Sequence, residues 1–418
     1  MSRSDPRDTR PTLRRRYRTA YATLPPGLQL VGLQVWMPIF FVSLFCLCYI
    51  NAFHAPAVRD APVAVVSAAT LPGLENATGG MFDYDQVATR TEAEDLVRSG
   101  ADIAALDLTT PGNPTLVIAS AHSYQAANVA KQTLTPVFAA QRQTLDVRDL
   151  APLPSHDLFG MTTMYLSLAW CIGGYMLALF LGLMGAPLRH RVRVGVILAG
   201  GVLLSLLAIV LAGPVIGAVQ GHFLPLWGIG CCWMTAIGLA TNGLSYFFGR
   251  FVAMPAMALF VFLSIPSSGA AYPAFMLPTF FGWLHPYVVG FGITEMIKHT
   301  VYGVGEPYAK GFLLLGCYAV AGVLLMLVGK QWRERREIRR ILAGRTTMFA
   351  DAQAASREHA IADREKILAK YGDDAHDPHA MAVAAEAQSR ANEDAFVANA
   401  RPLDGLEDID DEEPSRRT

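Results

Sequence analysis

Long apolar runs alternate with one long hydrophilic stretch along this chain. The first apolar run, 31–50, follows a strongly basic segment, residues 1–30. At about 1.5 Å per residue, a helix over this run reaches roughly 30 Å, the thickness of a hydrocarbon core. The pattern predicts a first membrane span whose N-terminal end lies in the cytoplasm. A cleaved signal peptide is the alternative, because Ala55-Pro56-Ala57 has the small-x-small form of a cleavage site.

Apolar runs return over residues 158–330. Five further spans are predicted, over Met161–Met184, Val194–Ala218, Leu224–Phe248, a stretch that begins near Phe251 and is cut at Pro266, and Gly311–Gly329. Basic residues follow the second, fourth and sixth spans, so these ends lie on the same side of the membrane as the basic N-terminus. Six spans with both termini in the cytoplasm follow from this pattern.

Residues 51–157 lose apolar density and alternate strand with helix patterns. The predicted strands and helices are, in order, Pro62–Ser67, Arg90–Ser99 with Thr91 as its cap, Asp102–Leu108, Thr115–Ser120 and Tyr124–Gln141. The fold class is therefore an α-helical polytopic membrane protein, with six transmembrane helices and a small α/β extracytoplasmic domain between the first two.

Residues 331–418 form an alanine-rich, charged tail that this topology places in the cytoplasm. Ala354–Lys370 predicts an exposed helix with weak i,i+4 pairs. The acidic run Asp404–Glu413 is expected to be disordered. Docking of a cytoplasmic partner and simple solubilisation both remain open for the tail.

Composition agrees with a membrane protein. Hydrophobic residues make up 52% of the 418 residues and charged residues only 17%. The net charge of −1 gives no electrostatic reason to expect nucleic acid as a partner. All six cysteines fall in apolar runs, so a disulfide framework for residues 51–157 is excluded.

Motifs for catalysis are missing from the sequence. The Gly329-Lys330 pair lacks the glycine and the Ser or Thr of a phosphate-binding loop, and no catalytic triad or zinc signature is present. We therefore expect a chain that is not an enzyme and that binds no cofactor or metal itself. An acidic cluster is interpreted as a solvated surface rather than a cation site, because no ligand spacing recurs. Its members are Asp83, Asp85, Glu92, Glu94 and Asp95.

Polar side chains within the predicted spans are few. Gln34, Thr241 and Asn242 are candidate pathway residues, and hydrogen bonds between helices are the alternative role. Since the spans carry almost no charged residues, a proton relay is not supported.

The stretch Ser267–Gly305 is apolar and aromatic, yet its prolines and glycines prevent one continuous helix. A broken segment at membrane depth is tolerated only where protein or a water-filled cavity covers its freed backbone groups. Glu295, Lys298 and His299 share one face of a short helix there. This helix either lines an exit or lies as a salt-bridged helix at the outer surface.

This stretch resembles the last extracytoplasmic segment of ABC-2 type export permeases, and most of all the YhgE/Pip (phage infection protein) branch. The resemblance rests on short motifs in a fixed order: Ser268-Gly269, Tyr272-Pro273, Leu277-Pro278 with Phe280-Phe281, and Pro286-Tyr287. In the hydrophilic stretch, Thr91-Glu92-Ala93 and Ala104-Ala105-Leu106 also match the family pattern.

The resemblance implies a permease in the bacterial plasma membrane that dimerises with itself or with a similar subunit. It implies that a separate ABC subunit binds ATP, and that 267–305 is a re-entrant or exit segment. It also implies that a helix before the first span, here Tyr17–Leu30, joins the contact with the ATPase. The implied coupling loop contains Arg189, His190, Arg191 and Arg193. Topology and lipid phosphate contact are the alternative account of these basic residues.

Three functions remain open at this point. The first is an export permease subunit whose substrate is lipidic, amphipathic or related to the cell envelope. The second is a membrane-anchored receptor or envelope-organising protein that displays the α/β domain without ATP-driven transport. The third, an intramembrane enzyme, would need polar catalytic side chains that the spans lack.

Overall fold

The structure is a computed structural model. It describes residues 25, 28, 35–66, 71–110, 112–184, 188–342, 348–371, 382–383 and 385–390. Ile39–Ile338 form one compact unit, and the two ends of the chain belong to another. The predicted helix Tyr17–Leu30 lies almost entirely outside the described residues, and Gln34 and Asp404–Glu413 lie wholly outside them.

Five helices in the described part of the chain are long and apolar enough to cross a membrane. The first comprises α3 (Trp36–Phe45), the π-turn η1 (Cys46–Ile50) and α4 (Asn51–Phe53). The others are α8 (Thr162–Met184), α9 (His190–Val210) with the π-turn η2 (Leu211–Val215), α10 (Phe223–Phe248) and α14 (Tyr308–Leu342). This mostly helical architecture is consistent with a helical membrane protein.

The predicted fifth span corresponds to a shorter apolar stretch, Ala253–Ser268. It follows η3 (Gly249–Val252) and consists of α11 (Ala253–Met257), the π-turn η4 (Ala258–Phe262) and η5 (Pro266–Ser268). Pro266 lacks a backbone N–H and stands at the first position of η5, so the longer helix ends before it. Five of the six predicted spans therefore have spanning length.

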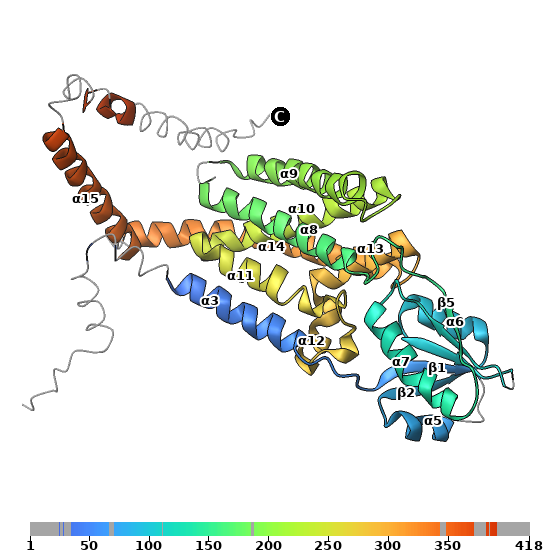
Figure 1. The fold of residues 1–418 in the computed structure, drawn as a ribbon. Coiled ribbons are helices and arrows are strands. Elements are labelled where there is room, and N and C mark those ends of the chain that lie inside the picture. Colours follow the sequence, from blue (N-terminus) through green and yellow to red (C-terminus); the bar gives the residue numbers. More distant parts are fainter. Residues whose placement is uncertain are drawn as a thin grey trace, which may run out of the picture. The chain divides into compact units, whose positions relative to one another are not determined.

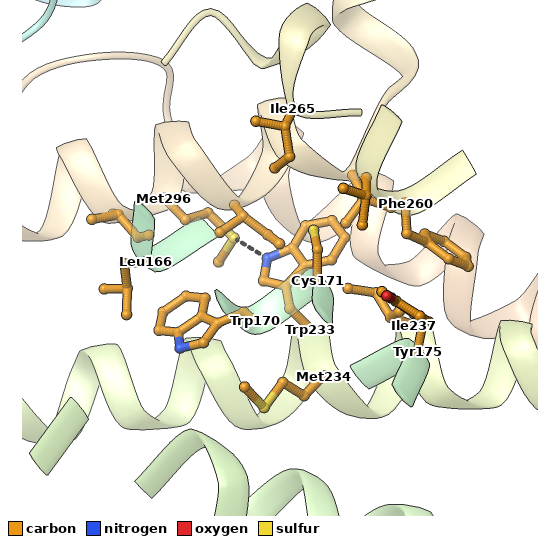
Figure 2. Close-up of a cluster of buried hydrophobic side chains, with 14 of the residues drawn as sticks. Leu166, Trp170, Cys171, Tyr175, Trp233, Met234, Ile237, Phe260, Ile265 and Met296 are labelled. Carbon is orange, nitrogen blue, oxygen red and sulfur yellow. Dashed lines mark hydrogen bonds between the residues drawn. The ribbon is translucent and has the colours of Figure 1, made fainter. Parts of the chain in front are cut away.

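Tryptophan side chains fill the interior of the helix bundle. α8, α9 and α10 pack against one another, and α13 (Val289–Tyr302) packs against α8 and α10 (Figure 1). Trp170 of α8 and Trp233 of α10 are fully buried. Figure 2 shows Trp233 donating its Nε1 hydrogen to Met296 Sδ of α13, at 3.3 Å. These large rings therefore occupy part of the space between α8, α10 and α13.

Residues 61–149 form an α/β lobe around a mixed five-stranded sheet of order β2-β1-β3-β4-β5 (Figure 1). The strands are β1 (Ala61–Val66), β2 (Phe82–Val87), β3 (Ala104–Asp107), β4 (Thr115–Ile118) and β5 (Asp146–Asp149). Only β3 and β4 pair antiparallel. Helices α5 (Leu71–Thr78) and α7 (Tyr124–Ala140) share one apolar core with the sheet, and α6 (Arg90–Ser99) packs in a second.

The predicted lobe elements are confirmed in kind and order, with one wrong cap. Thr89, not Thr91, caps α6: its Oγ1 accepts a hydrogen bond from the Glu92 N–H at 3.2 Å. The sequence reasoning missed α5, β2 and β5. In β2, exposed Asp83 and Asp85 alternate with buried Phe82 and Tyr84. The acidic cluster is therefore divided between an edge strand and a helix.

Beyond the last predicted span the chain stays helical. α14 continues without a break to Leu342, past the predicted end at Gly329. The predicted exposed helix Ala354–Lys370 lies inside α15 (Met348–Tyr371).

Candidate functional site

The predicted broken stretch is a series of short helices held by side-chain hydrogen bonds. After η5 come η6 (Ala274–Met276), α12 (Thr279–Leu284), η7 (His285–Tyr287) and α13. Ser264 Oγ accepts a hydrogen bond from the Gly290 N–H at 2.6 Å. Ser268 Oγ donates to the Ile265 carbonyl at 2.7 Å, and His285 Nδ1 lies 2.7 Å from the Ser267 carbonyl oxygen. Backbone groups freed by the breaks are thus paired inside the protein, as such a segment requires.

Glu295 is the centre of a buried charged cluster at the end of this stretch. Its Oε1 accepts a hydrogen bond from Lys298 Nζ at 3.0 Å, and its Oε2 accepts one from the Glu306 N–H at 3.0 Å. Only 5% of Glu295 and 3% of Lys298 are exposed. The predicted salt bridge is confirmed, but the helix is buried in the protein rather than exposed at its surface. A buried ion pair persists because each charge would be costly to bury alone.

The same carboxylate reaches the α/β lobe. His122, in the link between β4 and α7, places its Nε2 3.6 Å from Glu295 Oε2. Two glycines make this approach possible. A Cβ on Gly100 would lie 2.1 Å from His122 Nε2, and one on Gly305 would lie 2.5 Å from Glu295 Oε2. Both have a positive φ, of 82° and 93°, which glycine adopts without strain.

Backbone and apolar contacts complete this junction. The Gly305 N–H donates to the carbonyl of Arg98, in the last turn of α6, at 2.8 Å. Val304 is buried in the same apolar core as Val97 and Ala119 of the lobe. The end of α13 is therefore docked on the lobe by hydrogen-bonded, ionic and apolar contacts together.

A cavity of about 30 Å³ lies beside the junction, lined by lobe residues that include Asp102 and His122 and by Pro273 and Phe275 of the broken stretch. This is room for about one water molecule. Asp102 is 6% exposed, and its Oδ2 has no hydrogen-bond partner within the described protein. Burial, and secondly the nearby Asp85, raise the pKa of Asp102 to about 6.

Asp102→Asn is expected to stabilise the protein in a pH-dependent way. Because the folded pKa of about 6 exceeds the ordinary value of 3.8, the folded state binds more protons between these values. The free energy of unfolding therefore falls as pH rises from 3.8 to about 6, and it falls no further at higher pH. By about 1.4 kcal/mol per pKa unit, the substitution should recover on the order of 3 kcal/mol at pH 8 and almost nothing at pH 4.

Thermal unfolding of the full chain in detergent, measured from pH 4 to pH 8, checks this expectation. The control is Asp83→Asn, at an exposed position on β2, and its effect on stability should be the same from pH 4 to pH 8. If Asp102→Asn stabilised the protein equally at both ends of the range, ionisation of this carboxyl would not be the cause.

The other predicted residues of the exit segment lie in different environments. Leu277 is buried in the bundle core, and Tyr272 packs on Phe53 with ring centroids 5.6 Å apart. Tyr287 is exposed, and its carbonyl accepts a hydrogen bond from Tyr318 of α14 at 3.0 Å. The predicted set is Ser268, Gly269, Tyr272, Pro273, Leu277, Pro278, Pro286, Tyr287, Glu295 and Lys298. Of these, Glu295 and Lys298 join the charged cluster, and Pro273 lines the small cavity.

Thr241 and Asn242 are fully buried on α10. Asn242 Nδ2 lies 2.9 Å from Met326 Sδ of α14. This contact favours a role between helices for Asn242 over contact with a transported substrate.

The predicted coupling loop is short. Only residues 185–189 separate α8 from α9, and 185–187 lie outside the described residues. Arg189 and Arg191 are exposed, whereas Arg193 is buried with its guanidinium 5.8 Å from the Tyr246 ring centroid. His190 Nδ1 lies 2.6 Å from the Tyr246 hydroxyl. Of the four residues, the two exposed arginines are free to present their charge to another protein.

Sequence reasoning did not single out His122 and Asp102. Neither belongs to a motif, and each reaches the site only because the lobe docks on the broken stretch. No protein-family model, curated protein or solved structure matches the chain. A functional assignment therefore rests on the chain's own residues and geometry.

Proposed function

We propose that this chain is an export permease subunit of the ABC-2 class in the bacterial plasma membrane. Two such subunits form the pathway, and a separate ATP-binding subunit drives it. The lobe faces away from the cytoplasm, and both termini lie inside it. The substrate is lipidic, amphipathic or related to the envelope.

The broken stretch is the observation that carries this proposal. Besides five helices of spanning length in the described residues, the chain has a stretch that breaks at Pro266 and continues through short helices to α13. Its freed backbone groups are paired with Ser264, Ser268 and His285. Maintaining such a break costs regular helical hydrogen bonds, and membrane proteins tolerate it where protein buries the break or where it lines a cavity or pathway, so a break at this place is compatible with a pathway-lining segment.

The packing of the bundle supports a pathway at the seam between two subunits. Trp170 and Trp233 occupy part of the interior of one bundle. Apolar side chains of α9 and α14, such as Leu203 and Leu313, are exposed and suit lipid or a second subunit. These exposed apolar faces are consistent with a substrate that travels between subunits.

The coupling to ATP hydrolysis is tested by charge reversal at the start of α9. The double variant Arg189→Glu/Arg191→Glu should reduce the copurified ATP-binding subunit at least about tenfold, because both arginines are exposed at the predicted cytoplasmic end. ATPase activity of the complex in nanodiscs should fall in proportion. The matched control is Arg59→Glu/Arg142→Glu, which reverses one exposed arginine just before the lobe and one within it, and it should retain both the partner and the activity.

Failure to recover any ATP-binding subunit with the unaltered chain would contradict the export proposal. It would favour the receptor or envelope-organising role instead. The docked junction between α13 and the lobe suits that role too, since it would hold a displayed domain in one orientation.

A further inference from the structure

A groove of about 410 Å³ lies where α9 passes into α10. Its volume is within the range of about 300–1,000 Å³ that is usual for small-molecule sites. Ile209, Pro214, Val219 and Phe223 supply its apolar lining, and Gln220 and His222 stand at its polar edge. Ile209 and Val219 are buried, whereas Gln220 and His222 are exposed. The groove is thus apolar at its base and polar at its rim.

The chain's own backbone creates this groove. α9 ends in the π-turn η2, which contains Gly213 and Pro214. The link then folds back, because the N–H groups of Ala218 and Val219 both donate to the Ala212 carbonyl, at 2.8 and 3.1 Å. Gly213 has no side chain to fill the space under Val219. A regular helix end with a short turn would leave no such hollow, and π-turns are frequent at functional sites.

The groove lies at a membrane surface. α9 with η2 and α10 both have spanning length, so the link between them emerges from the bilayer. The lobe lies between the first and second spanning helices and this link between the third and fourth, which places both on the same side. The groove has an apolar base at the end of two spans and polar groups at its rim. A lipid matches this arrangement, with its acyl chain against the base and its headgroup at the rim.

We infer that this groove binds one phospholipid of the leaflet on the lobe side, with part of an acyl chain against Ile209, Pro214 and Phe223. Gln220 and His222 contact the headgroup. No Lys, Arg, Asp or Glu lines the groove, so the headgroup is zwitterionic rather than anionic. Binding here does not depend on the export proposal, because it requires only that the helices span a bilayer.

Saturable photolabelling tests the site. The full chain is placed in phosphatidylglycerol nanodiscs that contain an increasing fraction of phosphatidylcholine with a diazirine on its acyl chain, and labelled peptides are mapped by mass spectrometry. We expect label over residues 209–223 that saturates at one lipid per chain. Label spread evenly over the exposed faces of α3, α9 and α14, with no saturable component, would overturn the site. Preferential capture of a phosphatidylglycerol probe would overturn the headgroup assignment.

Groove-filling variants with matched controls distinguish a lipid bound in the groove from the lipid that surrounds the protein. Gln220→Trp and Pro214→Trp place an indole in the groove and should reduce the saturable label about tenfold, a loss of about 1.4 kcal/mol in binding. Leu224→Trp and Val215→Trp put the same ring on neighbouring exposed positions outside the groove and should change it less than about twofold. Equal labelling of filling and control variants would overturn the proposal. If Pro214→Trp fails to fold by thermal unfolding, Gln220→Trp alone decides.

Discussion

Glu295→Gln is expected to destabilise the protein by about 3–5 kcal/mol, because it leaves the Lys298 ammonium buried without a counter-charge. The amide that replaces Oε2 would also present hydrogens to the Glu306 N–H, which now donates to the carboxylate. Thermal unfolding of the full chain in detergent measures the loss. Hydrogen exchange of the Gly305 amide should rise in parallel, since that amide donates to Arg98 across the same junction.

Two further variants test whether the unpaired buried charge causes the loss of stability. Glu306→Gln removes a more exposed partner of Lys310 and should cost less than about 1 kcal/mol. Glu295→Gln combined with Lys298→Met removes both buried charges and should recover most of the stability, because neither is then left alone. If Glu295→Gln cost no more than Glu306→Gln, the buried pair would not hold the junction.

Gly322→Leu is expected to separate α14 from α10 at a cost of about 3 kcal/mol or more. A Cβ at Gly322 would lie 2.6 Å from the Ala240 backbone nitrogen and 2.9 Å from the Leu239 carbonyl carbon. Backbone atoms cannot move aside as a flexible side chain can, so the whole helix must shift. Thermal unfolding and the loss of the contact between Asn242 and Met326 would report the change.

Gly316→Leu is the control on the same helix. A Cβ there meets nothing within 4 Å, so the leucine projects into open space. The substitution should be neutral or slightly stabilising, because leucine favours a helix over glycine by up to about 1 kcal/mol. Equal effects of the two leucines would mean that close approach of α14 to α10 contributes nothing to stability.

Two of the spanning helices were predicted to within one residue, whereas the bounds of the other three differ by several residues or more. Met161–Met184 and Leu224–Phe248 each differ from α8 and α10 by one residue at one end. An apolar run of this length has few alternatives to a spanning helix, but the end of the apolar run is not always the end of the helix, since α14 continues through charged residues to Leu342. The same pattern did not resolve Ala253–Ser268, where π and 3₁₀ turns divide a shorter run.

The missed strands show where a local pattern is insufficient. β2 carries the alternation of buried and exposed residues, but its acidic positions favoured a solvated loop. β5 has no apolar pattern at all and exists only by pairing with β4 at the sheet edge. An edge strand is specified by its neighbour's hydrogen bonds, which sequence periodicity does not contain.

The sequence alone determined the spanning helices, the α/β lobe between the first two, and the broken stretch, because hydrophobic length, alternation and proline act locally. It also placed Glu295 and Lys298 one turn apart on a single helix face. Only the tertiary structure decided that this pair is buried, that His122 approaches it, and that a groove opens between α9 and α10. Those features depend on which distant segments pack together, and packing is set by the shape of the whole fold.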